Sequence, residues 1–466
     1  MAKDAVEREQ ARSAAVRELR ERRLALPDAV ETYTSLTAAA TAVGAAPTRM
    51  GARALPVPGE RGLFDVALNN TGTGWQERFL LFIPDLPAGV RAPAVVVFHK
   101  FGVSHWDAYY NTTFLTEARN RGWFMIAPLG ASGVNFGSLE SQVNTRAVLD
   151  LVTSIYPVDK NRVYGVGFSM GGGGVAAYAQ RNLDPNRVMF AAICDHSGGV
   201  SLSHTYFNET DDNDADDNIP VFGANLEVPD ILDYWFEGPP WVYSFNYQRC
   251  QSIEINPFTG LIVPGTDMAR NLKHIPTLVW LANDDPFALM VEQTMTFFGH
   301  IQTLNPANIL TLAPSTFHTW LSLNESLVCD YFAQFTLQLP TSGSVLADEN
   351  GVFLRFQIQQ DAAFHLTPFT WSVNTVQNQL NINQTQNLSR ISVNATELGL
   401  QYSQSLKINV FTSDGTGDEI LLREVPAAPN TVLRDGQPAS STYDVESRTL
   451  LIQETDANPH QWIVVP

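Results

Sequence analysis

A serine flanked by glycines lies where a strand-like segment meets a helix-like one. Gly167, Ser169 and Gly171 form the spacing G-x-S-x-G. A nucleophilic serine at such a turn must hold strained backbone dihedrals, and glycines two residues to either side let the strand and the helix approach without a Cβ clash. The N-terminus of the following helix favours developing negative charge. We predict that Ser169 is a nucleophile; the alternative is a glycine-rich turn without a catalytic role.

An alcohol is a weak nucleophile at neutral pH, so Ser169 needs an imidazole to take its proton and a carboxylate to orient that imidazole. Of the nine histidines, only His318 has a positional reason to serve, because it follows a strand-like run. Candidate acids end two other strand-like runs: Asp284 and Asp285 end one, and Asp195 ends the other. The residues alone leave the acid open among these three aspartates.

The elements that must bring these side chains to one edge are apolar strands that alternate with helices. Wholly apolar runs, such as Ala94 to Phe98, indicate strands buried on both faces. The strand-like runs are 62–67, 78–83, 94–98, 123–127, 162–168, 188–194, 277–281 and 309–312, with helical runs near 139–155, from 171, and near 289–304. This alternation predicts a doubly wound, mostly parallel α/β sheet that begins antiparallel.

Three other intervals depart from the alternation. Residues 197–275 show no clean periodicity and are predicted to be an insertion into an α/β domain of residues 51–339. In residues 340–466, polar and apolar runs such as 352–358, 406–411 and 449–454 lie between turn residues, which predicts a separate C-terminal antiparallel β domain. Residues 1–50 have the composition of a helical segment.

A resemblance to the α/β-hydrolase superfamily of serine esterases is carried by the segment Val158-Asp-Lys-Asn-Arg-Val-Tyr-Gly-Val-Gly-Phe-Ser-Met-Gly-Gly. It resembles most the polyhydroxybutyrate-depolymerase-like and dienelactone-hydrolase-like esterases and the catalytic domain of the prolyl oligopeptidase group, over about Arg78 to Leu339. The resemblance implies the α/β-hydrolase fold, a serine mechanism, acyl transfer and a lid-like role for the insertion. These families act on esters, amides and polymers, so the substrate does not follow.

The resemblance also implies site residues. It favours Asp285, because related sequences more commonly have an acid followed by proline at this turn. One oxyanion-hole N–H is expected from Met170, the residue after the nucleophile. The second is expected from His99-Lys-Phe-Gly, which is similar to the H-G-x-G loop of esterases; Phe101 is the assigned donor and Lys100 the alternative. Lys100 is also assigned as a cation that contacts substrate, although it could instead point outward.

The insertion is rich in aromatic residues that could line an acyl or aromatic pocket. Trp235 and Trp241 are therefore assigned to substrate binding, and the alternative is that they pack the insertion's own core. The acidic run Asp211-Asp-Asn-Asp-Ala-Asp-Asp-Asn lacks the glycine and distal glutamate of an EF-hand loop. We expect a solvated loop there and assign no metal site.

The composition of the chain limits which kinds of partner and substrate are expected. The chain is 44% hydrophobic without any stretch of about 20 apolar residues, so no integral membrane segment is expected. A net charge of -19 would repel phosphate backbones, which disfavours nucleic acid and favours a neutral ester or polymeric substrate. The three cysteines lie far apart, which indicates neither a zinc cluster nor a disulfide framework, and no cofactor is expected.

The compartment and the oligomeric state stay open. The N-terminal residues lack the apolar core of a secretory signal, which suits the cytoplasm. Low lysine usage and several N-x-S/T matches suit an extracytoplasmic protein instead.

These features together predict a serine hydrolase that cleaves carboxylic esters, polyesters among them, through an acyl-enzyme intermediate. A serine peptidase of the prolyl-oligopeptidase type is the first alternative, weakened because no N-terminal β-propeller precedes the α/β domain. A noncatalytic α/β-fold binding protein is the second, and the intact serine, acid and histidine order argues against it.

Overall fold

The computed structural model describes residues 55–57, 59–69, 71–211, 219–221, 224–314, 317–411, 418–454 and 456–466. The predicted helical segment 1–50 and nearly all of the acidic run that begins at Asp211 lie outside the described residues. The chain divides into two compact units. The first runs to Gln180 and continues over Val188–Leu337, and the second comprises Arg181–Arg187 and Gln338–Pro466.

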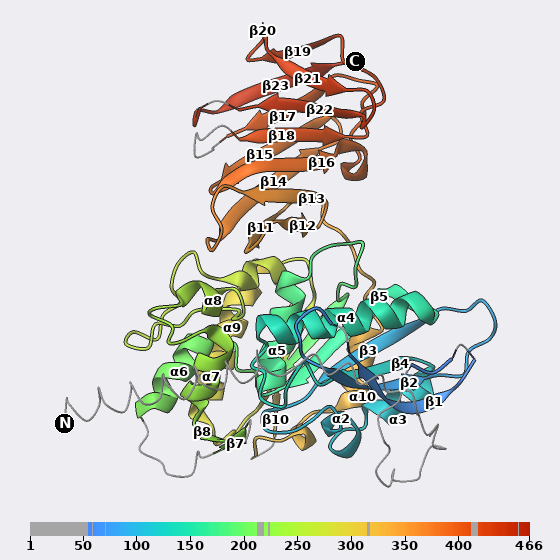
Figure 1. Cartoon of the computed structure of the whole chain (residues 1–466), viewed down its shortest axis with the longest axis vertical. Helices are drawn as coiled ribbons and strands as arrows, with labels where there is room; N and C mark the ends of the chain where they lie inside the picture. Colours follow the sequence, from blue (N-terminus) through green and yellow to red (C-terminus); the bar gives the residue numbers. More distant parts are fainter. Residues whose placement is uncertain are drawn as a thin grey trace. The chain divides into compact units, whose positions relative to one another are not determined.

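An eight-stranded sheet forms the centre of the first unit, with strand order β1-β2-β4-β3-β5-β6-β9-β10 (Figure 1). The pairs β1–β2 and β2–β4 are antiparallel, and all later pairs are parallel. The predicted doubly wound, mostly parallel sheet is confirmed. Its strands are β1 Gly62–Leu68, β2 Glu77–Ile83, β3 Ala92–Phe98, β4 Phe124–Pro128, β5 Val158–Phe168, β6 Ala192–His196, β9 Thr277–Ala282 and β10 Ile309–Ala313.

Apolar side chains alternate between the two faces of the sheet. In β3, Val96 and Phe98 belong to one buried layer, and Val95 and Val97 belong to the other. Helices contribute to both layers, which explains why the central strands are apolar throughout. The first layer contains side chains of α4 (Leu139–Ile155), α5 (Met170–Arg181) and α9 (Ala288–Leu304), and the second those of α2 (Asp107–Tyr110), α3 (Phe114–Arg121) and α10 (Glu325–Phe332).

The segment between β6 and β9 breaks the strand–helix alternation. Its elements are α6 Leu202–Asp211, β7 Ile219–Val221, β8 Ala224–Leu226, α7 Val228–Phe236, α8 Ser244–Gln248 and the 3-10 helix η2 Met268–Leu272. Tyr206, Trp235 and Tyr247 are buried in a cluster of their own that also includes Val134. The segment therefore has a small apolar core formed largely by its own aromatic residues.

Two strands of the first unit begin four residues away from their predicted start. β5 begins at Val158 rather than at 162, and β6 begins at Ala192 rather than at 188. Val188 and Phe190 are buried in the core although they precede the strand. An apolar run reports burial, whereas a strand also requires ladder hydrogen bonds. The run therefore begins before the strand at β6, and at β5 the strand extends back over the exposed Lys160 and Asn161.

Two β-sheets make up the second unit. Their strand orders are β11-β14-β15-β17-β23-β19-β20 and β12-β13-β16-β18-β22-β21. Most pairs are antiparallel, as predicted, but β15–β17 and β16–β18 are parallel. The bounds are β11 Gly343–Ala347, β12 Gly351–Phe353, β13 Phe356–Gln360, β14 Thr367–Asn374, β15 Gln379–Thr385, β16 Leu388–Asn394, β17 Leu406–Val410, β18 Glu419–Arg423, β19 Thr431–Arg434, β20 Gln437–Pro438, β21 Ser441–Asp444, β22 Thr449–Gln453 and β23 His460–Val465.

The predicted strand 352–358 is in fact a hairpin. β12 and β13 pair antiparallel, and Leu354 between them has a φ of 58°. A left-handed residue reverses the chain even though the polar–apolar alternation continues through it. The remaining short helices are η3 Trp320–Ser322 and η4 Ala395–Leu398. Within the described ranges, no helix has both the length and the apolar character needed to cross a bilayer.

Candidate active site

Ser169 occupies a sharp turn between β5 and α5. Its φ is 57°, in the left-handed region that non-glycine residues seldom adopt. The Ser169 amide donates to His196 O at 2.9 Å, and its carbonyl accepts from Gly172 N at 2.9 Å. A Cβ on Gly167 would lie 1.9 Å from Gly171 O, so the turn can close only with glycine there. A sharp strand-to-helix turn of this kind is the backbone geometry that a nucleophile elbow requires.

Asp285 and His318 meet at the same edge of the sheet, because they follow the neighbouring parallel strands β9 and β10. Asp285 Oδ2 accepts a hydrogen bond from His318 Nδ1 at 2.7 Å. Asp285 Oδ1 accepts from Phe287 N at 3.0 Å. Burial opposes ionisation of Asp285, but the hydrogen bond and charge of His318, together with the Phe287 amide, lower its pKa. An ionised Asp285 can therefore orient the imidazole.

The other two candidate acids lie elsewhere. Asp284 is exposed. Asp195 is buried, and burial raises its pKa to about 7. Among the described residues, neither aspartate is hydrogen-bonded to His318. Of the three aspartates, only Asp285 has the geometry of a triad acid.

Two phenylalanine rings enclose His318. The ring centroid of Phe168 lies 4.5 Å from that of His318, and the centroid of Phe287 lies 4.9 Å away. Phe168 directly precedes Ser169, so the elbow and the imidazole are neighbours.

Within the described part of the chain, the Ser169 hydroxyl makes no hydrogen bond; nucleophile–base contacts are often looser without substrate. The sequence carried no signal for Phe287 beyond its position two residues after Asp285.

The two assigned oxyanion donors both have available amides. In the described residues, neither Phe101 N nor Met170 N donates to a protein acceptor. Lys100 N, the alternative donor, already donates to Asp107 Oδ2 at 3.2 Å. The next amide, Gly102 N, donates to Gly133 O at 2.9 Å. The geometry thus favours Phe101 over Lys100 as the partner of Met170.

Trp235 and Trp241 have different environments. Trp235 is 6% exposed, and its indole N–H donates to Val134 O at 2.7 Å, so it packs the core of the insertion. Trp241 is 61% exposed, with its ring centroid 5.5 Å from that of Phe207. Neither contact brings the indole to Ser169 or His318, and a substrate-binding role for either tryptophan stays a prediction.

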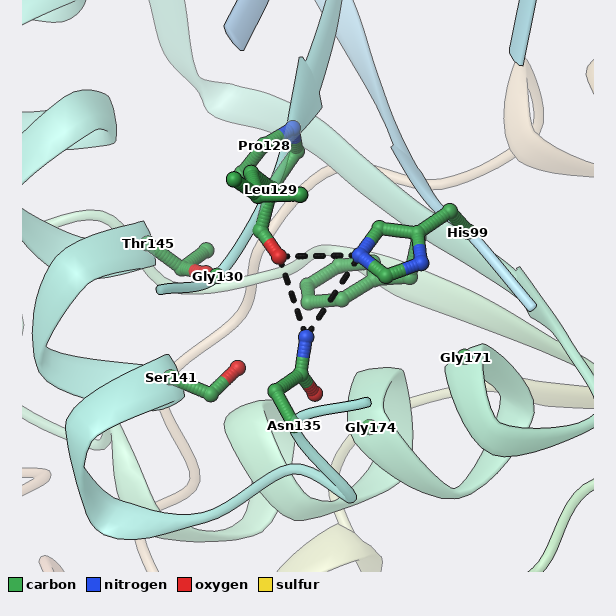
Figure 2. Close-up of a pocket in the computed structure, with 10 residues that line it drawn as sticks. His99, Pro128, Leu129, Gly130, Asn135, Ser141, Thr145, Gly171 and Gly174 are labelled. Carbon is green, nitrogen blue, oxygen red and sulfur yellow. Dashed lines mark hydrogen bonds between the residues drawn. The ribbon is translucent and has the colours of Figure 1, made fainter. Parts of the chain in front are cut away.

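Two further histidines near the site are engaged in structural contacts. His99 is buried, with Nδ1 2.8 Å from Lys100 O and Nε2 2.8 Å from Leu129 O. Figure 2 shows the Nε2 contact, with Asn135 Nδ2 meeting the same carbonyl at 3.0 Å. His196 Nε2 lies 2.7 Å from Ser322 Oγ, and burial, aided by the charge of His318, lowers the His196 pKa to about 3. His318 is left as the candidate base.

One side-chain cluster of the second unit has metal-ligand types. Glu454, Asp456 and His460 offer ligand atoms within 4.8 Å of one another. Arg434 Nη2 lies 2.8 Å from Glu454 and 2.7 Å from Asp456, so these carboxylates already have a cationic partner. The cluster is therefore explained as an ion-pair network.

No protein-family model matches the chain, and no curated protein matches it. Three similar solved structures are an S-formylglutathione hydrolase from Agrobacterium tumefaciens, a ferulic acid esterase and an acylaminoacyl peptidase from Pyrococcus horikoshii. Their sequence identities are 14%, 13% and 14%, and the TM-scores are 0.43, 0.41 and 0.39. Each covers 59% of this chain, and the matched parts are 94%, 98% and 42% of their own lengths.

By their names, these three structures are a hydrolase, an esterase and a peptidase. Their identities are too low to transfer an activity. The fold itself follows from this chain's own topology: a mostly parallel sheet with helices on both faces and a serine elbow between β5 and α5.

Proposed function

We propose that this protein is a serine hydrolase that cleaves carboxylic esters through an acyl-enzyme intermediate. The observation that carries the proposal is the 2.7 Å hydrogen bond between His318 and the buried Asp285, beside a serine in the strained backbone conformation of a nucleophile elbow. A buried carboxylate hydrogen-bonded to Nδ1 orients an imidazole and stabilises the imidazolium that forms when Nε2 accepts a proton.

In the proposed reaction, Ser169 Oγ attacks the substrate carbonyl while His318 Nε2 takes the hydroxyl proton. Asp285 stabilises the imidazolium through Nδ1–H. The amides of Phe101 and Met170 donate to the oxyanion, and the N-terminus of α5 adds a favourable dipole. His318 then protonates the leaving alcohol, and a water activated by the same histidine hydrolyses the acyl-enzyme. Polyester cleavage stays a prediction within this proposal.

The first test is hydrolysis of p-nitrophenyl esters from acetate to long acyl chains. Ser169→Ala should lower kcat by about 10³-fold or more, because it removes the attacking oxygen, while keeping the wild-type circular dichroism spectrum. Ser154, which is exposed on α4 and whose hydroxyl donates to Leu151 O, provides the matched control. Ser154→Ala should hydrolyse at the wild-type rate. Equal activity of wild type and Ser169→Ala would refute the assignment.

A fluorophosphonate probe gives an independent readout. It should label wild type at the tryptic peptide that contains Ser169, and labelling should disappear in Ser169→Ala. An enzyme that is inactive on every ester but is labelled at Ser169 would point to peptide substrates instead.

A further inference from the structure

The loop between β4 and α4, residues 129–137, contacts both proposed oxyanion donors. Gly133 O accepts from Gly102 N, the amide next to Phe101, at 2.9 Å. Phe136 N donates to Met170 Sδ at 3.3 Å. The rings of Phe136 and Phe101 lie 5.2 Å apart, centroid to centroid. A displacement of this loop would therefore move the Phe101 and Met170 amides relative to each other.

The backbone of the loop is strained. Ala131 and Phe136 have φ values of 71° and 45°, although neither is glycine. Such conformations cost about 1–3 kcal/mol each and persist only where surrounding contacts hold them. The loop thus depends on anchors elsewhere in the fold.

Glu77, the first residue of β2, is the principal anchor. Its carboxylate accepts from Gly130 N at 2.9 Å and from Ala131 N at 2.8 Å. Asn144 Nδ2 of α4 donates to the same carboxylate at 3.0 Å, and Thr73 Oγ1 donates to Asn144 Oδ1 at 2.6 Å.

Glu77 and Asn144 are fully buried, so their contacts are shielded from water. Burial raises the pKa of Glu77 to about 7, and hydrogen bonds from Ala131, Gly130 and other N–H donors oppose that rise. Glu77 is a costly group to bury, and the catalytic steps above do not use it. The stability of the sheet does not by itself require a carboxylate at position 77. The adjacent amides of Gly130 and Ala131, in a strained turn, do require an acceptor.

We propose that Glu77 is a positioning residue for the oxyanion hole: it holds residues 129–137, which in turn set the Phe101 and Met170 amides. The role rests on the proposed esterase function. Glu77 is hydrogen-bonded to the loop and not to the nucleophile, so we expect its effect on catalysis to act through the geometry of the oxyanion donors.

The test is ester hydrolysis by Glu77→Gln, in which an amide NH₂ replaces one acceptor oxygen and faces a loop N–H. We expect kcat to fall about 10- to 100-fold with KM changed less than about 2-fold, because oxyanion stabilisation develops only in the transition state. The affinity for a trifluoromethyl ketone, which forms a tetrahedral adduct with the serine, should weaken by the same factor as kcat/KM.

Asn308 provides the matched control. It is a buried amide that accepts from Thr277 N and donates to Ile301 O, away from the loop. Asn308→Ala should lower Tm at least as much as Glu77→Gln while kcat stays within about 2-fold of wild type. Asn144→Ala is the second variant if Glu77→Gln does not fold. It removes one donor to Glu77 but keeps both loop contacts, so kcat should fall by a smaller factor, again with KM nearly unchanged.

The outcomes separate the two proposals. If wild type hydrolyses esters, Ser169→Ala does not, and folded Glu77→Gln keeps wild-type kcat and inhibitor affinity, the positioning role is wrong and the esterase proposal stands. If wild type hydrolyses no ester and no fluorophosphonate labels Ser169, both proposals fail.

Discussion

Three neighbours hold His318 in place. Asp285 binds Nδ1, and the rings of Phe168 and Phe287 pack within 5 Å of the imidazole, centroid to centroid. The phenylalanines limit rotation of the ring. The Phe287 amide also binds Asp285 Oδ1, so the residues just after the acid support both partners.

At this scale, Asp285→Asn should identify the acid. Loss of the carboxylate presents an amide to His318 Nδ1 and favours the wrong tautomer, so we expect kcat to fall on the order of 10⁴-fold with little change in KM. Asp284→Asn and Asp195→Asn are the controls, and each should retain activity within about 10-fold. A large loss in Asp195→Asn with Asp285→Asn near wild type would transfer the role to Asp195.

Asp195 gives a prediction about pH and stability. Its pKa is 3.8 ordinarily and about 7 in the folded protein, so between these values the folded state binds a proton that the unfolded state has lost. The free energy of unfolding therefore falls as pH rises from about 4 to about 7. Asp195→Asn should remove that part of the decline, so its Tm relative to wild type should increase between pH 4 and pH 8. A constant Tm offset for Asp195→Asn across this pH range would contradict the prediction.

At the scale of elements, the contact between β5 and α5 makes the elbow. The two elements approach so closely that backbone atoms of Gly171 occupy the space where a side chain at position 167 would project. The strained φ of Ser169 is the consequence, and it lifts the serine out of the strand.

Alanine substitutions at two glycines test the elbow. Gly167→Ala should destabilise the protein by more than ~3 kcal/mol, or prevent folding, because a Cβ would lie 1.9 Å from Gly171 O. Gly174→Ala, inside α5, meets nothing closer than Phe98 Cδ1 at 3.7 Å and should be neutral or stabilise by up to ~1 kcal/mol through helix propensity. Chemical denaturation measures both. Similar free energies of unfolding for the two variants would show that β5 and α5 are farther apart at Gly167 than described.

At the scale of the whole molecule, the proposed triad lies entirely in the first unit, whereas the second unit is a pair of β-sheets with its own core. Residues 181–187 belong to the second unit although Arg181 is the last residue of α5. Arg181 pairs with Asp348 at 2.7 Å, and Leu354 N donates to Leu183 O at 2.7 Å. A chain that ends after Leu339 would lose both contacts.

We expect that truncated chain to hydrolyse small esters with a kcat near that of the full chain, at a lower Tm. Asp348→Asn in the full chain removes the Arg181–Asp348 ion pair, leaves the pair of Arg181 with Glu349, and serves as the control for the stability loss. Retained small-ester activity with lost polymer activity would indicate that the second unit binds polymer. A soluble, folded fragment without small-ester activity would contradict the prediction.

Local pattern in the sequence was sufficient for the sheet, the elbow and the position of His318 after β10, because each depends on neighbouring residues or on apolar periodicity. Tertiary structure decided which aspartate hydrogen-bonds to His318, because adjacent side chains such as Asp284 and Asp285 leave a strand end in different directions. It also decided that Trp235 is buried and Trp241 exposed, and it brought Glu77 to Gly130 and Ala131 across more than 50 residues. Such contacts depend on how separate elements pack, and no local spacing encodes them.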